Sequence, residues 1–250
     1  MKEETEFRPK PMVEVGGFPL LWHIMRIYMH FGHKDFIIAL GYKGNMIKDF
    51  FLNWRTYIND FTINMKTGRR EIYGNNHGDF RVTFVDTGQE TLTGGRILRC
   101  APYIEGKEFM VTYGDGLSNI DIRKVLEFHH KAKKMGTLSG VHSGSRFGLI
   151  DVNKKTGKIK KFHEKPVMKD YISGGYMVFN REALDYFTEG RMEDGLAVMA
   201  NKGQLAMFFH DGFWKAADTY NEVEELNNLW EKDRPWAVWE EKQNKKTTEK

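Results

Sequence analysis

The chain has 250 residues, of which 40% are hydrophobic and 29% charged, and its formal net charge is +4 at pH 7. These proportions are typical of a globular protein and exclude a disordered one, and the dispersed lysines and arginines do not indicate a nucleic-acid partner. No apolar run approaches the length of a membrane span and the charged N-terminus lacks the features of a signal peptide, so we predict a cytoplasmic protein without a membrane partner.

The first part of the chain alternates short apolar runs with amphipathic segments. In chain order, we predict a helix at residues 19–31, a strand at 36–40, a helix at 45–54, an irregular segment at 55–80, a strand at 81–85, a helix at 96–101, a strand from 109, a helix at 122–134 and a strand at 137–141. Pro19 suits the first turn of its helix, and Gly32 suits the end. Strands that alternate with helices predict a parallel α/β sheet.

The pattern changes after residue 141. Short strands are predicted at residues 148–152, 158–163, 175–179 and 204–210, joined by turns and small helices. They indicate a mixed extension of the sheet. Residues 220–232 form a last amphipathic helix, and the charged tail at 240–250 is predicted to be disordered.

The most informative local feature is the turn that follows the strand starting at residue 109. It places Asp115 between Gly114 and Gly116, where the lack of side chains allows a ligand to approach the backbone. A carboxylate is a suitable ligand for Mg²⁺ that also holds a substrate phosphate, and ligands of α/β proteins collect at the carboxyl ends of strands. The same residues also suit a plain tight turn.

Cysteine and histidine chemistry is not prominent. Cys100 is the only cysteine, which excludes an internal disulfide and predicts a buried thiol in a reducing compartment. The nine histidines show no zinc-type spacing, so we interpret them as structural or surface residues.

Several separated segments resemble one enzyme family. They are residues 10–17, 113–116, 164–166 and 174–175, with finer features at 86–88, 93–96 and 209–214. In this order the segments resemble the sugar-phosphate nucleotidyltransferases, and the finer features are most similar to the glucose-1-phosphate cytidylyltransferases among them. The likeness runs from about residue 10 to residue 239.

The resemblance implies a fold and a reaction. The implied fold is a Rossmann-like, mixed but mainly parallel sheet flanked by helices, with a small C-terminal extension, in one domain over residues 1–239. The implied reaction is Mg²⁺-dependent transfer of a cytidylyl group from CTP to glucose 1-phosphate. Two alternatives remain: transfer of a thymidylyl or uridylyl group to a sugar 1-phosphate, and a catalytically silent regulatory or assembly subunit.

The resemblance also implies site residues. Asp115 and Asp218 would hold Mg²⁺, and Lys10 would neutralise nucleotide phosphate. The remaining implied contacts are Thr91, Arg96 and Gly114 for the nucleotide, and Glu164, Lys165, Gly174 and Gly175 for the sugar phosphate. Asp218 also suits the N-terminal cap of the last helix, and the paired glycines also suit a plain β-bulge. A homo-oligomer is expected, with Trp236 and Trp239 as candidate interface residues.

The chain departs from the family pattern at its start. Family members open with a strand and a glycine-rich loop of the form Gly-Gly-x-Gly-Thr-Arg, and neither precedes Lys10 in this sequence. Either the functional protein has a further segment or this is an altered member; the abrupt join after Lys2 favours the first. Residues 188–197 are also shorter than the corresponding family loop. A chain that lacks the loop is expected to bind CTP weakly or not at all, because the loop supplies backbone N–H groups to the triphosphate.

Overall fold

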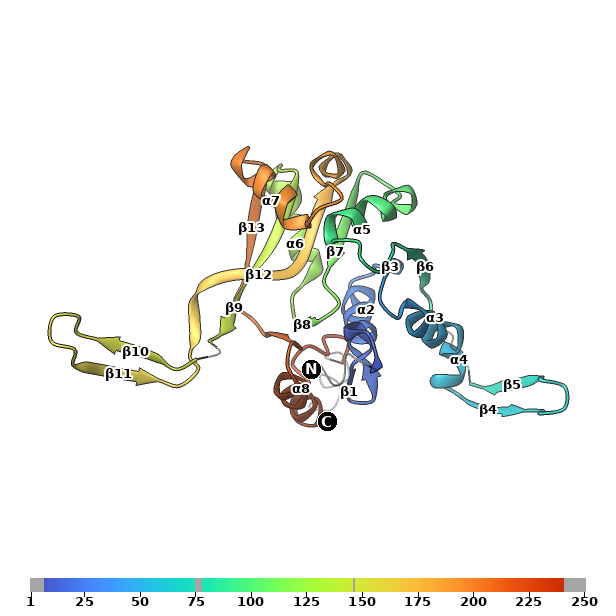
Figure 1. The fold of residues 1–250 in the computed structure, drawn as a ribbon. Helices are drawn as coiled ribbons and strands as arrows, with labels where there is room; N and C mark the ends of the chain where they lie inside the picture. The colour runs from blue at the N-terminus through green and yellow to red at the C-terminus, as the bar shows by residue number, and fades with distance from the viewer. Residues whose placement is uncertain (1–6, 75–77, 146, 241–250) are drawn as a thin grey trace, which may run out of the picture.

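The computed structural model describes residues 7–74, 78–145 and 147–240, and Figure 1 shows its arrangement. The elements of the first half are η1 (Lys10–Met12), β1 (Glu14–Val15), β2 (Phe18–Pro19), α2 (Leu20–His30), β3 (Asp35–Leu40), α3 (Gly44–Leu52), α4 (Trp54–Tyr57), β4 (Asp60–Ile63), β5 (Arg70–Tyr73), β6 (Arg81–Asp86), α5 (Thr93–Cys100) and η2 (Ala101–Tyr103). Those of the second half are β7 (Glu108–Thr112), β8 (Gly116–Ser118), α6 (Ile122–Ala132), β9 (Gly136–Gly144), β10 (Leu149–Val152), β11 (Ile159–His163), β12 (Val167–Asn180), η3 (Arg181–Tyr186), α7 (Met192–Asn201), β13 (Leu205–His210), β14 (Trp214–Ala216) and α8 (Tyr220–Lys232).

The largest sheet has four strands in the order β13-β9-β12-β7. Strand β13 is parallel to β9, whereas β12 is antiparallel to both β9 and β7. The long strand β12 has 14 residues, and its second half pairs with β7 on one side and β9 on the other. Strand β7, which leads to Asp115, is therefore at the edge of this sheet.

The predicted mixed α/β fold is confirmed, but the described residues do not show a mainly parallel sheet, because their strands form several separate sheets. Strands β3 and β6 make a parallel pair of their own, with Asp35 opposite Arg81 and Leu40 opposite Asp86. The physical reason is that, in the described part of the chain, β3 pairs only with β6 and β7 pairs only with β12. Nothing described joins the two sheets into one.

The main core lies between helix α2, strands β8 and β12, and helix α8. Pro19 immediately precedes α2. The buried face of this helix packs in the core and carries apolar residues at helical spacing, including Leu20, Ile24 and Ile27. Tyr28 of the same helix stacks on Tyr176 of β12, with ring centroids 5.9 Å apart. Within the described residues, no helix is both long and apolar enough to cross a membrane.

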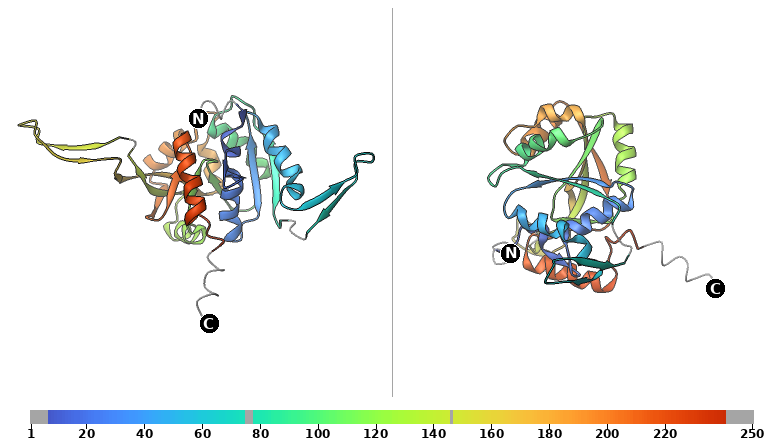
Figure 2. Two further views of the ribbon diagram at one scale, coloured as in Figure 1. Left: turned by 90° about the horizontal axis from the view of Figure 1, so that it is seen from below. Right: turned by 90° about the vertical axis from the view of Figure 1, so that its right-hand side faces the viewer.

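Two β-ribbons project from the body on opposite sides (Figures 1 and 2). Strands β4 and β5 form one ribbon, and β10 and β11 form the other. All residues of β10 and β11 are exposed. The first ribbon corrects the prediction of an irregular segment at 55–80, because β4 and β5 both lie within it.

Most other predicted elements are confirmed within a few residues, including the helix at 122–134 and the last helix, which matches α8. The segment after residue 204 is packed on the body: β13 extends the main sheet, and β14 pairs with β8. The predicted tail falls, except for Glu240, outside the described residues.

Candidate active site

Asp115 lies in the turn between β7 and β8, and the glycine before it has a steric reason. A Cβ atom on Gly114 would lie 2.7 Å from Cγ of Pro11, too close for any real side chain. The turn and the Lys10-Pro11 segment are therefore packed directly against each other, and only glycine fits this contact. This packing brings Lys10 to Asp115.

Lys10 lies between two carboxylates. Its Nζ donates a hydrogen bond to Oδ2 of Asp115 at 2.6 Å and another to Oδ1 of Asp218. The side chains are 28% exposed for Lys10, 32% for Asp115 and 37% for Asp218, so the group is accessible to a ligand. Lys10 precedes Asp115 by 105 positions and Asp218 by 208 positions. The fold thus brings together three predicted site residues that are distant in the chain.

The electrostatics of the group follow from its charges. Burial lowers the pKa of Lys10, but hydrogen bonds and charge attraction from Asp115 and Asp218 outweigh burial and hold the pKa above its usual value. Lys10 is therefore charged at neutral pH. Two carboxylates against one ammonium leave a negative excess at this point.

The donor set suits a divalent cation. Two carboxylate oxygens converge on a single cationic atom, and Mg²⁺ binds few carboxylates together with phosphate oxygens and waters. Among the described residues, no group of three or more histidine, cysteine or acidic side chains could hold a metal. Asp115 and Asp218 are thus suited to a shared metal site that substrate completes.

Asp218 is not the cap of helix α8. The cap is Thr219, whose side chain accepts a hydrogen bond from the backbone N–H of Glu222. Glu222 reaches back and accepts from the N–H groups of Asp218 and Thr219, both at 2.8 Å. This capping box fixes the backbone beside Asp218 and leaves the Asp218 carboxylate for Lys10. A threonine followed three residues later by glutamate could have revealed the cap in the sequence.

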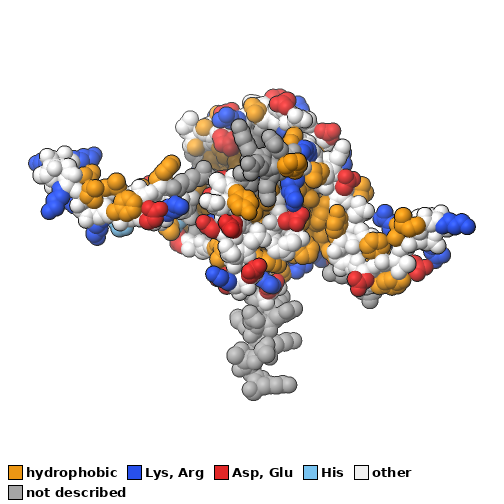
Figure 3. All heavy atoms as spheres, turned by 60° about the horizontal axis from the view of Figure 1, so that its bottom comes forward, with side chains coloured by type: hydrophobic (Ala, Val, Ile, Leu, Met, Phe, Trp, Pro, Cys, Tyr) orange, Lys and Arg blue, Asp and Glu red, His pale blue; other side chains and the backbone are white. Residues whose placement is uncertain are grey.

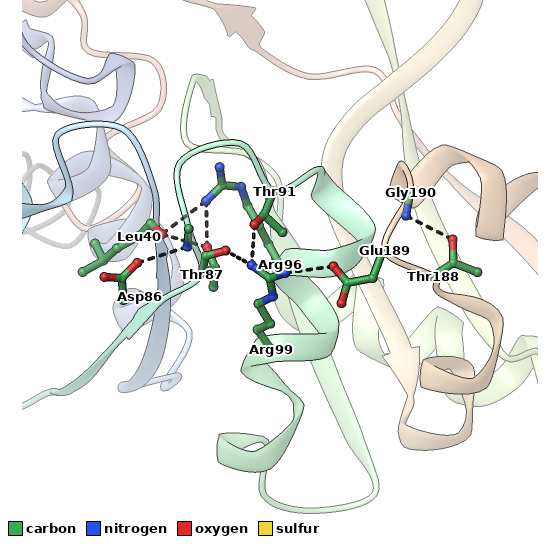
Figure 4. A network of polar contacts seen from close by, with 10 residues as sticks. Leu40, Asp86, Thr87, Thr91, Arg96, Arg99, Thr188, Glu189 and Gly190 are labelled. Carbon is green, nitrogen blue, oxygen red and sulfur yellow. Dashed lines mark hydrogen bonds and ion pairs between the residues drawn. The ribbon is translucent and has the colours of Figure 1, made fainter.

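Arg96 and Thr91 belong to a network at the ends of β3 and β6 (Figure 4). Arg96 Nη1 donates to Oγ1 of Thr87 at 2.7 Å and to the carbonyl of Leu40 at 3.2 Å, and Nη2 donates to the carbonyl of Gln89 at 3.0 Å. Thr91 Oγ1 accepts from Arg99, a residue that sequence reasoning did not single out. Arg96 thus orders the loop that carries Thr91.

A cavity of about 900 Å³ connects this network with the turn at Asp115. Its lining includes Pro11, Arg96 and Gly114. Arg96 and Gly114, two of the predicted nucleotide contacts, therefore face the same space.

The predicted sugar-phosphate residues are divided between two places. Gly174 and Gly175 are part of β12, where the Gly175 carbonyl accepts from the Tyr113 N–H at 3.3 Å. Glu164 and Lys165 are exposed at the base of the ribbon of β10 and β11. The pairing of β12 with β9 changes register between Ser173 and Met177, so a bulge accompanies the paired glycines. Gly175 has a φ of +80°, which glycine adopts most readily.

Tyr113 and Glu193 were missed by sequence reasoning. The Tyr113 hydroxyl donates to Oε1 of Glu193 at 2.6 Å, which ties the turn before Asp115 to helix α7. Burial, the hydrogen bond to Glu193 and the charges of Glu193 and Asp115 raise the pKa of Tyr113. Tyr113 is therefore a neutral hydrogen-bond donor. The two residues are 80 positions apart, and no local pattern signals the pair.

The predictions of a buried Cys100 thiol and of structural or surface roles for the adjacent histidines, His129 and His130, are confirmed. Cys100 is buried, and burial raises the pKa of its thiol to about 11. His129 is 2% exposed and contacts Thr137 Oγ1 and Asn180 Oδ1, whereas the neighbouring His130 contacts Glu108. The adjacent histidines thus serve different structural partners.

Comparison with known proteins identifies the family of the chain. Residues 5–219 match the model of the family described as nucleotidyl transferase. The chain is similar to a glucose-1-phosphate cytidylyltransferase of Salmonella typhimurium, with 40% identity over 96% of this chain and 95% of that protein. A probable glucose-1-phosphate cytidylyltransferase of Bacillus subtilis is 38% identical over the same shares.

Solved structures share the fold at lower sequence identity. HddC from Yersinia pseudotuberculosis superposes with a TM-score of 0.65 at 21% identity, covering 89% of this chain and 90% of that one. An apo UDP-glucose pyrophosphorylase gives a TM-score of 0.65 at 16% identity, covering 94% of both chains. With the family match over most of its length, the chain belongs to the nucleotidyl transferase family.

Proposed function

We propose that this chain transfers the cytidylyl group of CTP to glucose 1-phosphate in the cytoplasm, giving CDP-glucose and pyrophosphate with Mg²⁺ as cofactor. The observation that carries the proposal is the convergence of Lys10, Asp115 and Asp218 on one point. The identity of 40% to the Salmonella protein over 96% of the chain supports the choice of the two substrates.

The reaction needs positioning and charge neutralisation more than covalent catalysis. An oxygen of the sugar phosphate attacks the α-phosphorus of CTP in line, and pyrophosphate leaves from the opposite side. Asp115 and Asp218 would hold Mg²⁺, which neutralises phosphate charge when bound. Lys10 adds a second positive charge, held between the carboxylates until phosphate oxygens compete for it.

The other proposed contacts surround this group. Arg96 and Gly114 share the cavity beside it, and Arg96 also fixes the loop of Thr91, which supports a nucleotide site on this side. Gly174 and Gly175 pack against Val141 and Tyr113, respectively, and their backbone would contact the sugar. Glu164 and Lys165 would bind the sugar hydroxyls and the sugar phosphate, respectively.

A panel of nucleotides tests the proposal. The protein is mixed with glucose 1-phosphate, Mg²⁺ and CTP, dTTP or UTP in turn, and pyrophosphate release is measured. We expect release with CTP, at a low rate for a chain without the glycine-rich loop, because the triphosphate then lacks the N–H donors of that loop. A preference for dTTP or UTP would refute cytidylyl transfer, and no release with any nucleotide would favour the catalytically silent subunit.

Asp115→Asn is the sharper variant, because it keeps the shape of the side chain and removes its charge. We expect it to lower kcat by about a hundredfold or more while CTP still binds. Asp79→Asn is the matched control, since Asp79 is an exposed residue that pairs with Lys34 away from this site. Equal activities of the two variants would show that Asp115 is not a metal ligand in the reaction.

We also propose that the protein assembles with copies of itself, although not through the tryptophans first considered. Trp236 is fully buried and hydrogen-bonds His23, and Trp239 packs against the main core. Both rings belong to an aromatic cluster around His23, and Trp236 has no exposed surface to offer to an interface.

The ribbon of β10 and β11 offers a better surface. Its register places Ile150 opposite Phe162 and Val152 opposite Ile159 on one face, and all four are between 39% and 62% exposed. Hydrophobic side chains are visible on this arm in Figure 3. An isolated two-stranded ribbon is marginally stable, so this face favours cover by another surface. Residues 149–163 hold five lysines and one aspartate, whereas α8 holds four glutamates and one lysine, a complementarity that favours a second copy.

A further inference from the structure

The turn that carries Asp115 is held by backbone hydrogen bonds on both sides. The N–H of Tyr113 donates to the Gly175 carbonyl at 3.3 Å, and the N–H of Ala217 donates to the Asp115 carbonyl at 2.8 Å. The second bond also brings Asp218 to Asp115, because Asp218 follows Ala217 in the chain. The two proposed metal ligands are therefore tied to each other on one side, and the other side of the turn depends on Tyr113.

The side chain of Tyr113 is fixed by two contacts. Its ring packs on Gly175, where a Cβ atom would lie 2.7 Å from Cδ2 of the ring. Its hydroxyl donates to Oε1 of Glu193 at 2.6 Å. A displacement of the Tyr113 backbone would move Asp115 with it, because only Gly114 separates the two residues. The hydrogen bond of the hydroxyl therefore restrains the position of Asp115.

Glu193 is a suitable anchor because it is itself attached to a second helix. It lies in the first turn of α7, where a carboxylate is favoured. Its Oε2 accepts from Oγ1 of Thr93, the first residue of α5, at 3.4 Å, and Thr93 Oγ1 accepts from the Met192 N–H at 2.8 Å. Burial raises the pKa of Glu193, but hydrogen bonds from Tyr113, the backbone and Thr93 outweigh burial and lower the pKa. Glu193 is therefore charged at neutral pH, which strengthens the hydrogen bond that it accepts from Tyr113.

A second carboxylate of the same segment serves a different partner. Glu189 lies four residues before Glu193, and its Oε2 accepts from Nη2 of Arg99 at 3.1 Å (Figure 4). Arg99 in turn donates to the Thr87 carbonyl and to Oγ1 of Thr91. Glu189 thus holds the loop of Thr91, whereas Glu193 holds the turn of the proposed metal ligand. This difference makes Glu189 a matched control for Glu193.

We propose that Glu193 is a positioning residue for the metal site, which acts through the Tyr113 hydroxyl to hold Asp115 where it shares a divalent cation with Asp218. This role rests on the metal site proposed above. Neither Glu193 nor Tyr113 binds the cation. Loss of their contact leaves both aspartates in the chain but lets the distance between the two carboxylates vary, so the cation is held less tightly.

A titration with Mn²⁺ in place of Mg²⁺ tests this role without turnover, because electron paramagnetic resonance measures the free ion. We expect Tyr113→Phe and Glu193→Ala each to raise the Kd of the full chain for Mn²⁺ about fivefold or more. Tyr113→Phe keeps the ring on Gly175 and the charge of Glu193, so its effect reports the hydroxyl alone. Glu193→Gln keeps an oxygen that accepts from the hydroxyl, and it should restore the Kd to within about twofold of the unaltered protein.

A double variant and two controls separate this path from a general loss of structure. If Glu193 acts through the hydroxyl, the variant that combines Tyr113→Phe with Glu193→Ala should bind Mn²⁺ no more weakly than either single variant. Tyr73→Phe removes a hydroxyl that donates to Oγ1 of Thr62 at 3.0 Å on the ribbon of β4 and β5, and Glu189→Ala removes the partner of Arg99. Both controls should keep the Kd for Mn²⁺.

The outcomes distinguish the positioning role from the metal site on which it rests. If Asp115→Asn weakened Mn²⁺ binding but Tyr113→Phe and Glu193→Ala did not, the positioning role would be wrong and the metal site would stand. If Asp115→Asn left the Kd unchanged, the metal site itself would be refuted, and the positioning role with it. Additive losses in the double variant, or equal losses in Glu193→Gln and Glu193→Ala, would show that Glu193 does not act through the Tyr113 hydroxyl.

Discussion

At the start of helix α8, two adjacent side chains serve different partners. Thr219 caps the helix, and Asp218 contacts Lys10. We expect Thr219→Ala to lower the free energy of unfolding by about 1 kcal/mol, because the N–H of Glu222 loses its acceptor, with little change in kcat/KM. Asp218→Asn should lower kcat/KM by about a hundredfold or more and leave stability nearly unchanged.

Urea unfolding and pyrophosphate release, measured on both variants, check this separation. The Mg²⁺ concentration for half-maximal activity should rise for Asp218→Asn alone. If the threonine variant lost activity while the aspartate variant kept it, Thr219 and not Asp218 would be the residue that the reaction needs.

His23 is a buried residue whose ionisation links stability to pH. Trp236 Nε1 donates to Nδ1 of His23, so Nε2 carries the proton and donates to the Val15 carbonyl at 2.8 Å. Burial lowers the pKa of His23 to about 4, well below its usual value. The folded protein therefore holds this side chain neutral.

The consequence is a loss of stability in acid. Between the unfolded pKa of about 6.5 and the folded value, the unfolded chain binds the additional proton, so the free energy of unfolding falls as pH falls. The expected loss at His23 is on the order of 3 kcal/mol between pH 7.5 and pH 4. Urea unfolding across this range measures it. His23→Gln should flatten the dependence, whereas His163→Gln, at an exposed position of β11, should keep it.

At the scale of elements, one guanidinium holds a helix to a strand pair. Arg96 of α5 reaches the ends of β3 and β6 through Leu40 and Thr87, and its flat shape packs on Gly41, where a Cβ would lie 2.4 Å from Nη1. Lysine has no planar fork and cannot reach these acceptors together. We expect Arg96→Lys to lower the free energy of unfolding by about 2 kcal/mol.

The matched control for this substitution is Arg69→Lys, since the Arg69 side chain is 79% exposed. Chemical unfolding of both variants provides the comparison. Indistinguishable stabilities would show that the network of Arg96 contributes nothing to holding α5 in place.

Local patterns predicted most elements, and their failures have identifiable causes. The ribbon of β4 and β5 was missed because its strands have four residues each and are exposed, so the apolar alternation is short. Contacts such as Tyr113 with Glu193 depend on tertiary packing and leave no trace in sequence spacing. The group of Lys10, Asp115 and Asp218 was predictable only because each member lies in a recognisable motif.

At the scale of the whole molecule, sequence reasoning recognised the layers of the fold but not the continuity of its sheet. Apolar runs at 36–40 and 109–112 were correctly predicted as strands. Whether two such strands are neighbours depends on what lies between them, which periodicity does not encode.

The contrast between the body and its ribbons gives a prediction for the whole molecule. The ribbon of β10 and β11 is exposed along both strands and carries five lysines, whereas the lysines of α6 lie on a helix packed against the sheet. Segments with few buried contacts open most easily, so trypsin should cut first between residues 154 and 161. If a second copy covers the ribbon, this cut should slow about tenfold when nine-tenths of the chains are assembled.

Limited proteolysis at several protein concentrations, read by mass spectrometry beside a light-scattering mass, checks both expectations. Phe162→Ser removes an apolar side chain from the ribbon face and should make the cleavage rate independent of concentration. Asp151→Ser, on the opposite face, should preserve the dependence. First cleavage within the body would contradict the order of local stabilities. If the rate of ribbon cleavage in the unaltered protein did not change with assembly, the copies would associate through another surface. A ribbon buried between two chains cannot enter the active site of the protease.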